Sequence, residues 1–226
     1  MRAFFLLPIL SLFGCPASVT AEGMDDGFGM GWSAVWFHLE MKQGDAEGIT
    51  LSNVMGLCAK QQAYWESFEA YTDAYEDADD DCAEIEQPLR DFVAAAEALT
   101  FDGANYSSGG PIDDMDDGDY DLGEDAYWSV FGYTDDMDTS YLDDFDADDK
   151  ISEGCGMDAD DMNEEIDGDA WAVEDGELVI DSVNDEANVS GSVEGEMMEG
   201  KDEEGAFKAT FNAAYCEIEI PDSMGF

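Results

Sequence analysis

The chain has 226 residues, of which 58 are acidic and seven are Lys or Arg, so its formal net charge is −51. Such a surface repels phosphate backbones, whose binding depends on Lys and Arg, so nucleic-acid binding is excluded. Hydrophobic residues still make up 45% of the chain, which excludes an acidic disordered tail and predicts a folded core. Because so many like charges repel unless salt screens them, we expect a solvated surface adapted to high salt.

An apolar run, Ala3 to Phe13, follows the single positive charge of Arg2. A membrane-spanning helix needs roughly 20 apolar residues, so this run is too short to remain in a bilayer. A charged start, a short apolar core and small residues afterwards are typical of a secretory signal peptide. We therefore expect residues 1–14 to be a signal peptide and the rest of the chain to work outside the cytoplasm.

The run ends in Leu12-Phe13-Gly14-Cys15, which resembles a bacterial lipobox. With its acidic body and four further cysteines, the chain is similar in style to uncharacterised acidic lipoproteins of bacterial cell envelopes. The resemblance implies that Cys15 is lipidated and anchors the protein in a membrane, and Pro16 after it implies the outer membrane. An alternative stays open, because Val19-Thr20-Ala21 suits an ordinary signal peptidase that would cut after Ala21 and release the protein.

Setting Cys15 aside leaves four cysteines, Cys58, Cys82, Cys155 and Cys216. In an exported chain this even number predicts two disulfides, for which three connectivities exist. A Cys58–Cys82 bond is disfavoured, because an unbroken helix after Cys58 would carry the chain away at about 1.5 Å per residue. A zinc site is the alternative, but the chain has one histidine and no CxxC pair.

The glycine-rich and acidic segment 15–31 predicts a flexible tether before a single domain at 32–226. Trp32 to Met41 alternates as a strand with bulky residues on both faces, so we expect cover on both sides. Ile49 to Leu51 returns as a shorter strand.

Two helical patterns follow, which together predict a helical hairpin at 53–102. Ser52 or Asn53 is expected to cap the first helix, which runs to about Tyr75. Its apolar stripe is formed by Tyr64, Phe68, Tyr71 and Tyr75, and that of the second helix by Ile85, Leu89, Phe92, Val93, Ala96 and Leu99.

The acidic segment 111–170 predicts a long loop region with one strand, Ala126 to Tyr133. The segment 171–220 predicts a β-meander whose last two strands form a hairpin around Gly200 to Gly205, with a bulge near Ala213-Ala214 where the apolar positions change parity. One apolar face per strand predicts an α+β fold, in which an antiparallel sheet of about five to six strands is covered by the helical hairpin.

Calcium is the sharpest chemical hypothesis, because two segments resemble EF-hand loops imperfectly. The first frame offers Asp113, Asp117, Asp121 and Glu124, and the second offers Asp144, Asp146 and Asp148. Carboxylates are the ligands that hard cations prefer, but in so acidic a segment about one such match is expected by chance.

Enzyme motifs are lacking, so we expect no catalytic residues and no cofactor other than Ca²⁺. The single histidine, His38, lies in an aromatic strand, where a role on a covered face is expected. The sequence therefore predicts a non-enzymatic binding or surface domain that is lipid-anchored in the cell envelope. The alternatives are a calcium-binding envelope protein and, with less support, an extracellular hydrolase.

Overall fold

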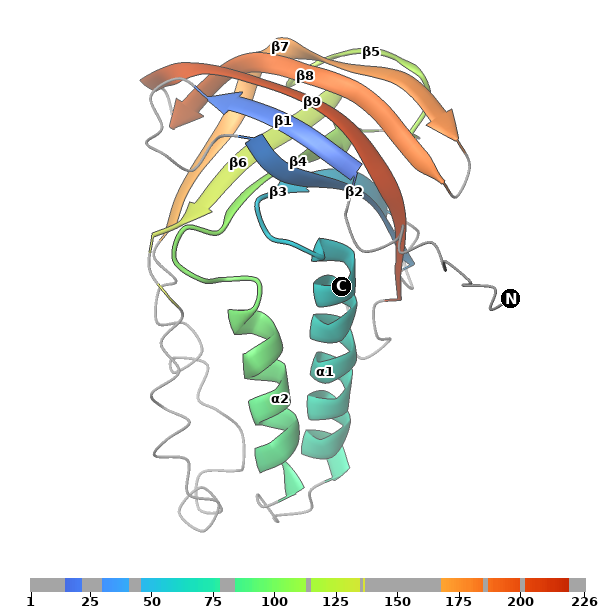
Figure 1. Ribbon diagram of the computed structural model, residues 1–226, viewed down its shortest axis with the longest axis vertical. Helices are drawn as coiled ribbons and strands as arrows, with labels where there is room; N and C mark the ends of the chain where they lie inside the picture. Colours follow the sequence, from blue (N-terminus) through green and yellow to red (C-terminus); the bar gives the residue numbers. More distant parts are fainter. Residues whose placement is uncertain are drawn as a thin grey trace, which may run out of the picture.

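The computed structural model describes residues 15–21, 30–40, 46–77, 84–112, 115–134, 136, 168–184, 187–199 and 202–219. These residues form nine strands and two helices (Figure 1). In chain order they are β1 (Cys15–Ala21), β2 (Met30–Glu40), β3 (Ala46–Ser52), α1 (Leu57–Asp77), α2 (Glu86–Glu97), β4 (Asn105–Pro111), β5 (Gly118–Asp121), β6 (Ala126–Tyr133), β7 (Gly168–Asn184), β8 (Asn188–Glu199) and β9 (Asp202–Glu219).

The strands make a single sheet that closes on itself as a barrel. Their order is β5-β7-β6-β4-β3-β2-β1-β9-β8, and a further pairing of β7 with β8 joins the two sides. Seven strands complete the ring, because β2 also pairs directly with β9, in parallel. β1 lies between β2 and β9 over part of their length, and β5 lines up beside β7.

The prediction of an open sheet covered by a helical hairpin is therefore wrong. Alternating apolar and polar residues suit an open sheet and a barrel equally, so the pattern alone does not decide between them. Closure instead follows from the length of the last three strands, which have 17, 12 and 18 residues. Strands this long twist and coil until the two sides of the sheet meet.

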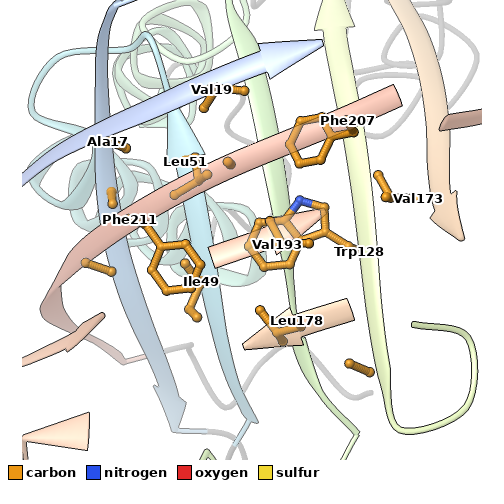
Figure 2. Packing of buried hydrophobic residues seen from close by; sticks show 14 of the residues in the cluster. Ala17, Val19, Ile49, Leu51, Trp128, Val173, Leu178, Val193, Phe207 and Phe211 are labelled. Carbon is orange, nitrogen blue, oxygen red and sulfur yellow. The ribbon is translucent and has the colours of Figure 1, made fainter. Parts of the chain in front are cut away.

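Side chains from opposite strands fill the barrel interior (Figure 2). Trp128 of β6 and Phe211 of β9 stack there with 6.1 Å between their ring centroids. Trp128 Nε1 donates a hydrogen bond to Ser107 Oγ at 2.6 Å, so the buried indole is satisfied. Around these rings lie side chains that are at most 2% exposed, namely Val19, Ile49, Leu51, Val173, Leu178, Val193 and Phe207.

β2 and β9 are covered on both faces, as the sequence predicts for the strand that begins at Trp32. Trp36 of β2 points into the barrel, whereas Phe37 lies in a second cluster with α1 on the outside. On β9, Ala213 faces the interior and Cys216 faces that outer cluster.

The bulge predicted near Ala213-Ala214 is wrong, because the strand pairing runs in step through these residues. The apolar positions change parity there because the helices begin to cover the outer face. The irregularity in the β8–β9 pairing lies instead between Met197 and Met198.

The predicted helical hairpin is present, but it stands away from the barrel, and among the described residues its apolar contact with the barrel lies at one end (Figure 1). Further out, the two helices bury aromatic side chains against each other. Phe92 of α2 lies 5.3, 5.4 and 5.9 Å from the rings of Tyr64, Phe68 and Tyr71. Three residues of the predicted stripe therefore form the contact surface between the helices, whereas the fourth, Tyr75, is 48% exposed.

Ser52 and Asn53 do not cap α1, which begins at Leu57. They instead join the segment before α1 to the segment after α2. The Ser52 hydroxyl donates to the Asn105 carbonyl at 2.8 Å, and Asn53 Oδ1 accepts from the Asn105 amide at 2.9 Å. Because both side chains bridge to β4, the helix starts later than the capping pattern predicts.

Two side chains bind carbonyl groups just after the end of α2. Lys60 Nζ donates to the Ala98 carbonyl at 2.9 Å, where a cation also favours the negative end of the helix dipole. The Tyr106 hydroxyl, from the outer face of β4, donates to the Leu99 carbonyl. The hairpin is thus anchored through polar contacts as well as through the apolar cluster.

A disulfide joins α1 to β9. Cys58 and Cys216 are bonded, with 5.9 Å between their Cα atoms. This pairing confirms the prediction of a disulfide and excludes a Cys58–Cys82 bond, whereas Cys82 and Cys155 lie outside the described residues.

Part of the predicted tether at 15–31 belongs to the barrel. β1 pairs with β2 and β9, and Val19 is 2% exposed. Its sequence, CPASVTA, has too little hydrophobic pattern to predict a strand. It forms one because its backbone pairs with β2 on one side and with β9 on the other.

Candidate functional site

Two neighbouring pockets lie on the outside of the barrel, between α1 and the strands on that side. The first, of about 280 Å³, is mainly apolar and lies against β3, β4 and β6, and the second, of about 270 Å³, is acidic and lies between α1 and β9. Trp65 of α1 and Ile218 of β9 line both pockets. We call the two pockets together the α1 groove, and refer to them as its apolar half and its acidic half.

One face of α1 forms a wall of the α1 groove. Cys58, Gln62, Trp65 and Glu69 follow one another at intervals of four, three and four residues, which places them on one side of a helix. The disulfide fixes this side against β9, and Gln62 Nε2 donates to the Glu217 carbonyl at 3.1 Å. Tyr64 and Phe68 hold the Trp65 ring from the side, with centroids at 5.1 and 6.1 Å in edge-to-face contacts. The indole is thus set at a defined position.

The floor of the apolar half is low because its outward side chains are small. Gly48 and Thr50 of β3 and Ser108 of β4 lie there, and Tyr127 of β6, which is 55% exposed, borders them. A Cβ atom on Gly48 would lie 3.7 Å from the Gly109 carbonyl oxygen and 4.0 Å from Tyr127 Oη, which are ordinary contact distances. The floor therefore has room for a side chain at position 48, and the glycine leaves this space open.

The acidic half carries three exposed carboxylates, Glu66 and Glu69 of α1 and Glu217 of β9. Among the described residues that line either half, none is Lys, Arg or His. The groove therefore has a negative potential, which attracts cations and repels anions.

A second polar site lies at one end of the barrel. His38 Nδ1 is 2.9 Å from Glu47 Oε1, and the ring lies 6.2 Å from that of Tyr215. The histidine is 19% exposed, which agrees with the prediction of a covered face. Trp36 contacts Tyr215 edge-to-face at 5.0 Å, and its buried Nε1 has no hydrogen-bond acceptor among the described residues.

The shifted pKa values lie mainly where the hairpin meets the barrel. Burial raises the pKa of Tyr106 well above its usual range, and the neighbouring Tyr133 adds to the shift. Burial also raises the pKa of Tyr133 and Tyr64. On the far side of the barrel, the hydrogen bond and charge of Lys208 lower the pKa of Glu194. Tyr64, Tyr106 and Tyr133 lie where the hairpin is attached to the barrel, and this attachment becomes less stable when they ionise.

The predicted calcium ligands are only partly described. Asp117, Asp121 and Glu124 are exposed around β5, between β4 and β6, so strands rather than helices flank this segment. Within the described part of the chain, no three His, Cys, Asp or Glu side chains are grouped closely enough to hold a metal ion. Four predicted ligands lie outside that part, namely Asp113, Asp144, Asp146 and Asp148. A calcium site therefore stays a prediction.

Sequence reasoning missed Trp65, Tyr127 and Gly48 as site residues. Trp65 lies next to the aromatic stripe of α1 but not on it, and an aromatic residue beside a complete stripe was the available signal. Nothing in the sequence indicates that β3, β6 and α1 meet at one groove.

Neither α1 nor α2 is long and apolar enough to span a membrane. No protein-family model, no curated protein and no solved structure matches this chain.

Proposed function

We propose that this chain is an exported, non-enzymatic binding domain, anchored in the bacterial cell envelope through a lipid on Cys15, with the α1 groove as its binding site. The acidic surface keeps the domain solvated in high salt. The geometry of the α1 groove supports the proposed binding, and the position of β1 supports the proposed lipid anchor.

The position of β1 favours cleavage before Cys15 over cleavage after Ala21. β1 begins at Cys15 and ends at Ala21, so the second cut would remove the whole strand. The loss would expose backbone of β2 and β9 that β1 now pairs, and it would remove the buried Val19 from the interior. Cleavage before Cys15 leaves the barrel complete and places the lipid at its first strand.

The cleavage site and the lipid anchor are tested by mass spectrometry of the mature protein from the membrane fraction of the producing bacterium. We expect an N-terminal Cys15 that carries acyl chains, and a Cys15→Ala variant that is not acylated. A mature chain that begins at Glu22 and is found outside the cells would contradict the anchor.

Binding in the α1 groove is supported by a rigid aromatic wall facing a floor of small side chains. Pockets for small ligands are concave and mostly apolar, with a few polar groups at fixed positions. Here the disulfide and the ring contacts of Trp65 fix one wall, and the paired strands β3 and β4 fix the floor. The groove is thus already formed before a ligand arrives, which lowers the entropy cost of binding.

The neutral fluorophore N-phenyl-1-naphthylamine tests whether the α1 groove accepts a ligand. We expect saturable dye fluorescence, excited through tryptophan, with the wild-type protein. Gly48→Val should abolish it because the new side chain fills the floor. Ser192→Val, on β8 at the opposite side of the ring, is the matched control and should bind the dye normally. Equal dye binding by wild type and Gly48→Val would refute the site.

A further inference from the structure

We infer that the ligand of the α1 groove is a small organic cation, with its apolar body in the apolar half and its charge toward the acidic half. This inference rests on the proposed function and names the chemical class of the ligand. It depends on the meeting of aromatic and acidic side chains at Trp65.

The size of the groove favours a small molecule over a folded partner. The apolar half holds about 280 Å³, close to the lower end of the range of small-molecule pockets, about 300 Å³. Its floor of glycine and short hydroxyl side chains leaves space for aliphatic groups, and Trp65, Phe37 and Tyr127 contribute aromatic surface. Such surfaces attract alkylated ammonium groups, because the ring face carries partial negative charge.

Charge selects among the molecules of that size. Glu66, Glu69 and Glu217 line the acidic half next to Trp65, and the described lining of the groove has no basic side chain. An anion would therefore be repelled, and a neutral ligand would gain nothing from the carboxylates. An inorganic cation would use the carboxylates but would gain nothing from the apolar half. An organic cation uses both halves.

The acidic surface in general does not explain this arrangement. Acidic groups elsewhere on the barrel, such as Glu177 of β7, do not line the α1 groove with its fixed indole. Along one face of α1, by contrast, Trp65 and Glu69 lie one turn apart, and Glu66 follows directly after the indole. A cation over the indole therefore lies near two carboxylates of the same helix and a third from β9.

Choline and 3,3-dimethylbutan-1-ol form the matched pair of probes, because they have nearly the same shape and differ in charge. In calorimetric titrations at 0.5 M NaCl, we expect saturable binding of choline and at least tenfold weaker binding of the neutral alcohol. Gly48→Val should abolish choline binding, whereas Ser192→Val should leave it unchanged.

A pair of charge variants separates a local effect from the total charge. Glu217→Gln should weaken choline binding about fivefold, and Glu177→Gln, which removes the same charge from the far side of the ring, should change it less than twofold. Equal effects of the two variants would show that only diffuse charge acts and would overturn the inference.

Two other results would overturn the inference, and they bear differently on the proposed function. If the neutral alcohol binds as tightly as choline and Gly48→Val abolishes both, the groove is a site for neutral ligands and the proposed function survives. If choline gives no saturable heat, the cation is refuted, and the neutral dye then decides whether the groove binds ligands at all.

Discussion

The disulfide between Cys58 and Cys216 should provide a large share of the stability of the fold. The two residues are 158 positions apart in the sequence, so the bond closes a very long loop in the unfolded chain. In the loop-entropy treatment, closing a loop of that length stabilises the native state by about 5 kcal/mol at 25 °C. A Cys58→Ala/Cys216→Ala double variant removes this constraint.

The assay is urea unfolding at pH 7 and 2 M NaCl, followed by tryptophan fluorescence and by helical circular dichroism. A loss of about 5 kcal/mol corresponds to a midpoint about 2 M lower in urea, at a slope of about 2.5 kcal/mol per molar. Alanine replaces both cysteines because Cys216 is 2% exposed, and a serine hydroxyl there would be buried beneath α1.

A control accounts for the buried sulfur atoms that the variant also loses. Val35→Ala empties part of the same outer cluster with the disulfide intact, and it should cost about 2 kcal/mol. If the cysteine variant costs no more than Val35→Ala, the bond does not restrict the unfolded chain and the loop-entropy reasoning fails.

Four further predictions follow from the described contacts. Gly109→Ala should destabilise the protein by about 1–3 kcal/mol in urea unfolding, because its Cβ would lie 2.1 Å from the Tyr127 carbonyl oxygen. Gly48→Ala, on the adjacent strand, should be neutral or slightly stabilising, and equal effects of the two changes would contradict the different space around them. Phe92→Ala should cost about 3 kcal/mol, lost first from the helical signal, since the ring joins three aromatic side chains of α1; a loss below 1 kcal/mol would show that the stripe contributes little. The free energy of unfolding should keep its full value below the unfolded tyrosine pKa of about 10, and it should fall as the pH rises through the raised pKa of Tyr106. Tyr106→Phe should therefore resist alkali better than wild type, and the same loss of circular dichroism with rising pH in the two proteins would contradict this. With a net charge of −51, the melting temperature should rise with NaCl; added calcium should raise it further at fixed 2 M NaCl if a defined site exists, and a shift that NaCl alone reproduces would exclude that site.

The longer elements could be predicted from the sequence because their patterns are complete in themselves. The stripe of α1, the alternation from Ala126 to Tyr133 and the hairpin of β8 and β9 each needs only local periodicity. Two-sided bulk likewise indicated that the strand beginning at Trp32 is covered on both faces. These patterns specify elements and faces, but they do not specify which strands become neighbours.

β4 shows why the remaining strands were missed. Its sequence, NYSSGGP, has the composition of a loop. In the barrel, Gly109 lies opposite Trp128, and Ser107 accepts the hydrogen bond of that indole. A Cβ on Gly109 would lie 2.7 Å from the indole ring, so the small residues of β4 are the counterpart of a large residue on β6. The small residues of β4 are therefore explained by the large residue on β6, and the space for that large residue is explained by β4.

The α1 groove likewise depends on residues of β3, β4 and α1 that are far apart in the sequence. Small outward residues on β3 and β4 would be unremarkable on an open sheet facing solvent. They form a floor because the disulfide holds α1 beside them and brings Trp65 to the edge of this floor. Sequence reasoning assigned Tyr64, Phe68, Tyr71 and Tyr75 to an apolar stripe and gave Trp65 no role. The first three pack against Phe92, whereas Tyr75 is 48% exposed.

The N-terminal strand connects export with folding. If the signal peptide is removed before Cys15, the first residue of the mature protein is also the first residue of β1. The lipid would then be attached next to the position where Cys15 pairs with Ala34, without the flexible spacer that the composition predicts. Removal of the strand would leave β2 and β9 paired directly only from Val35 and Ala214 onward. The choice of cleavage site therefore decides both where the protein resides and whether this part of the barrel wall is complete.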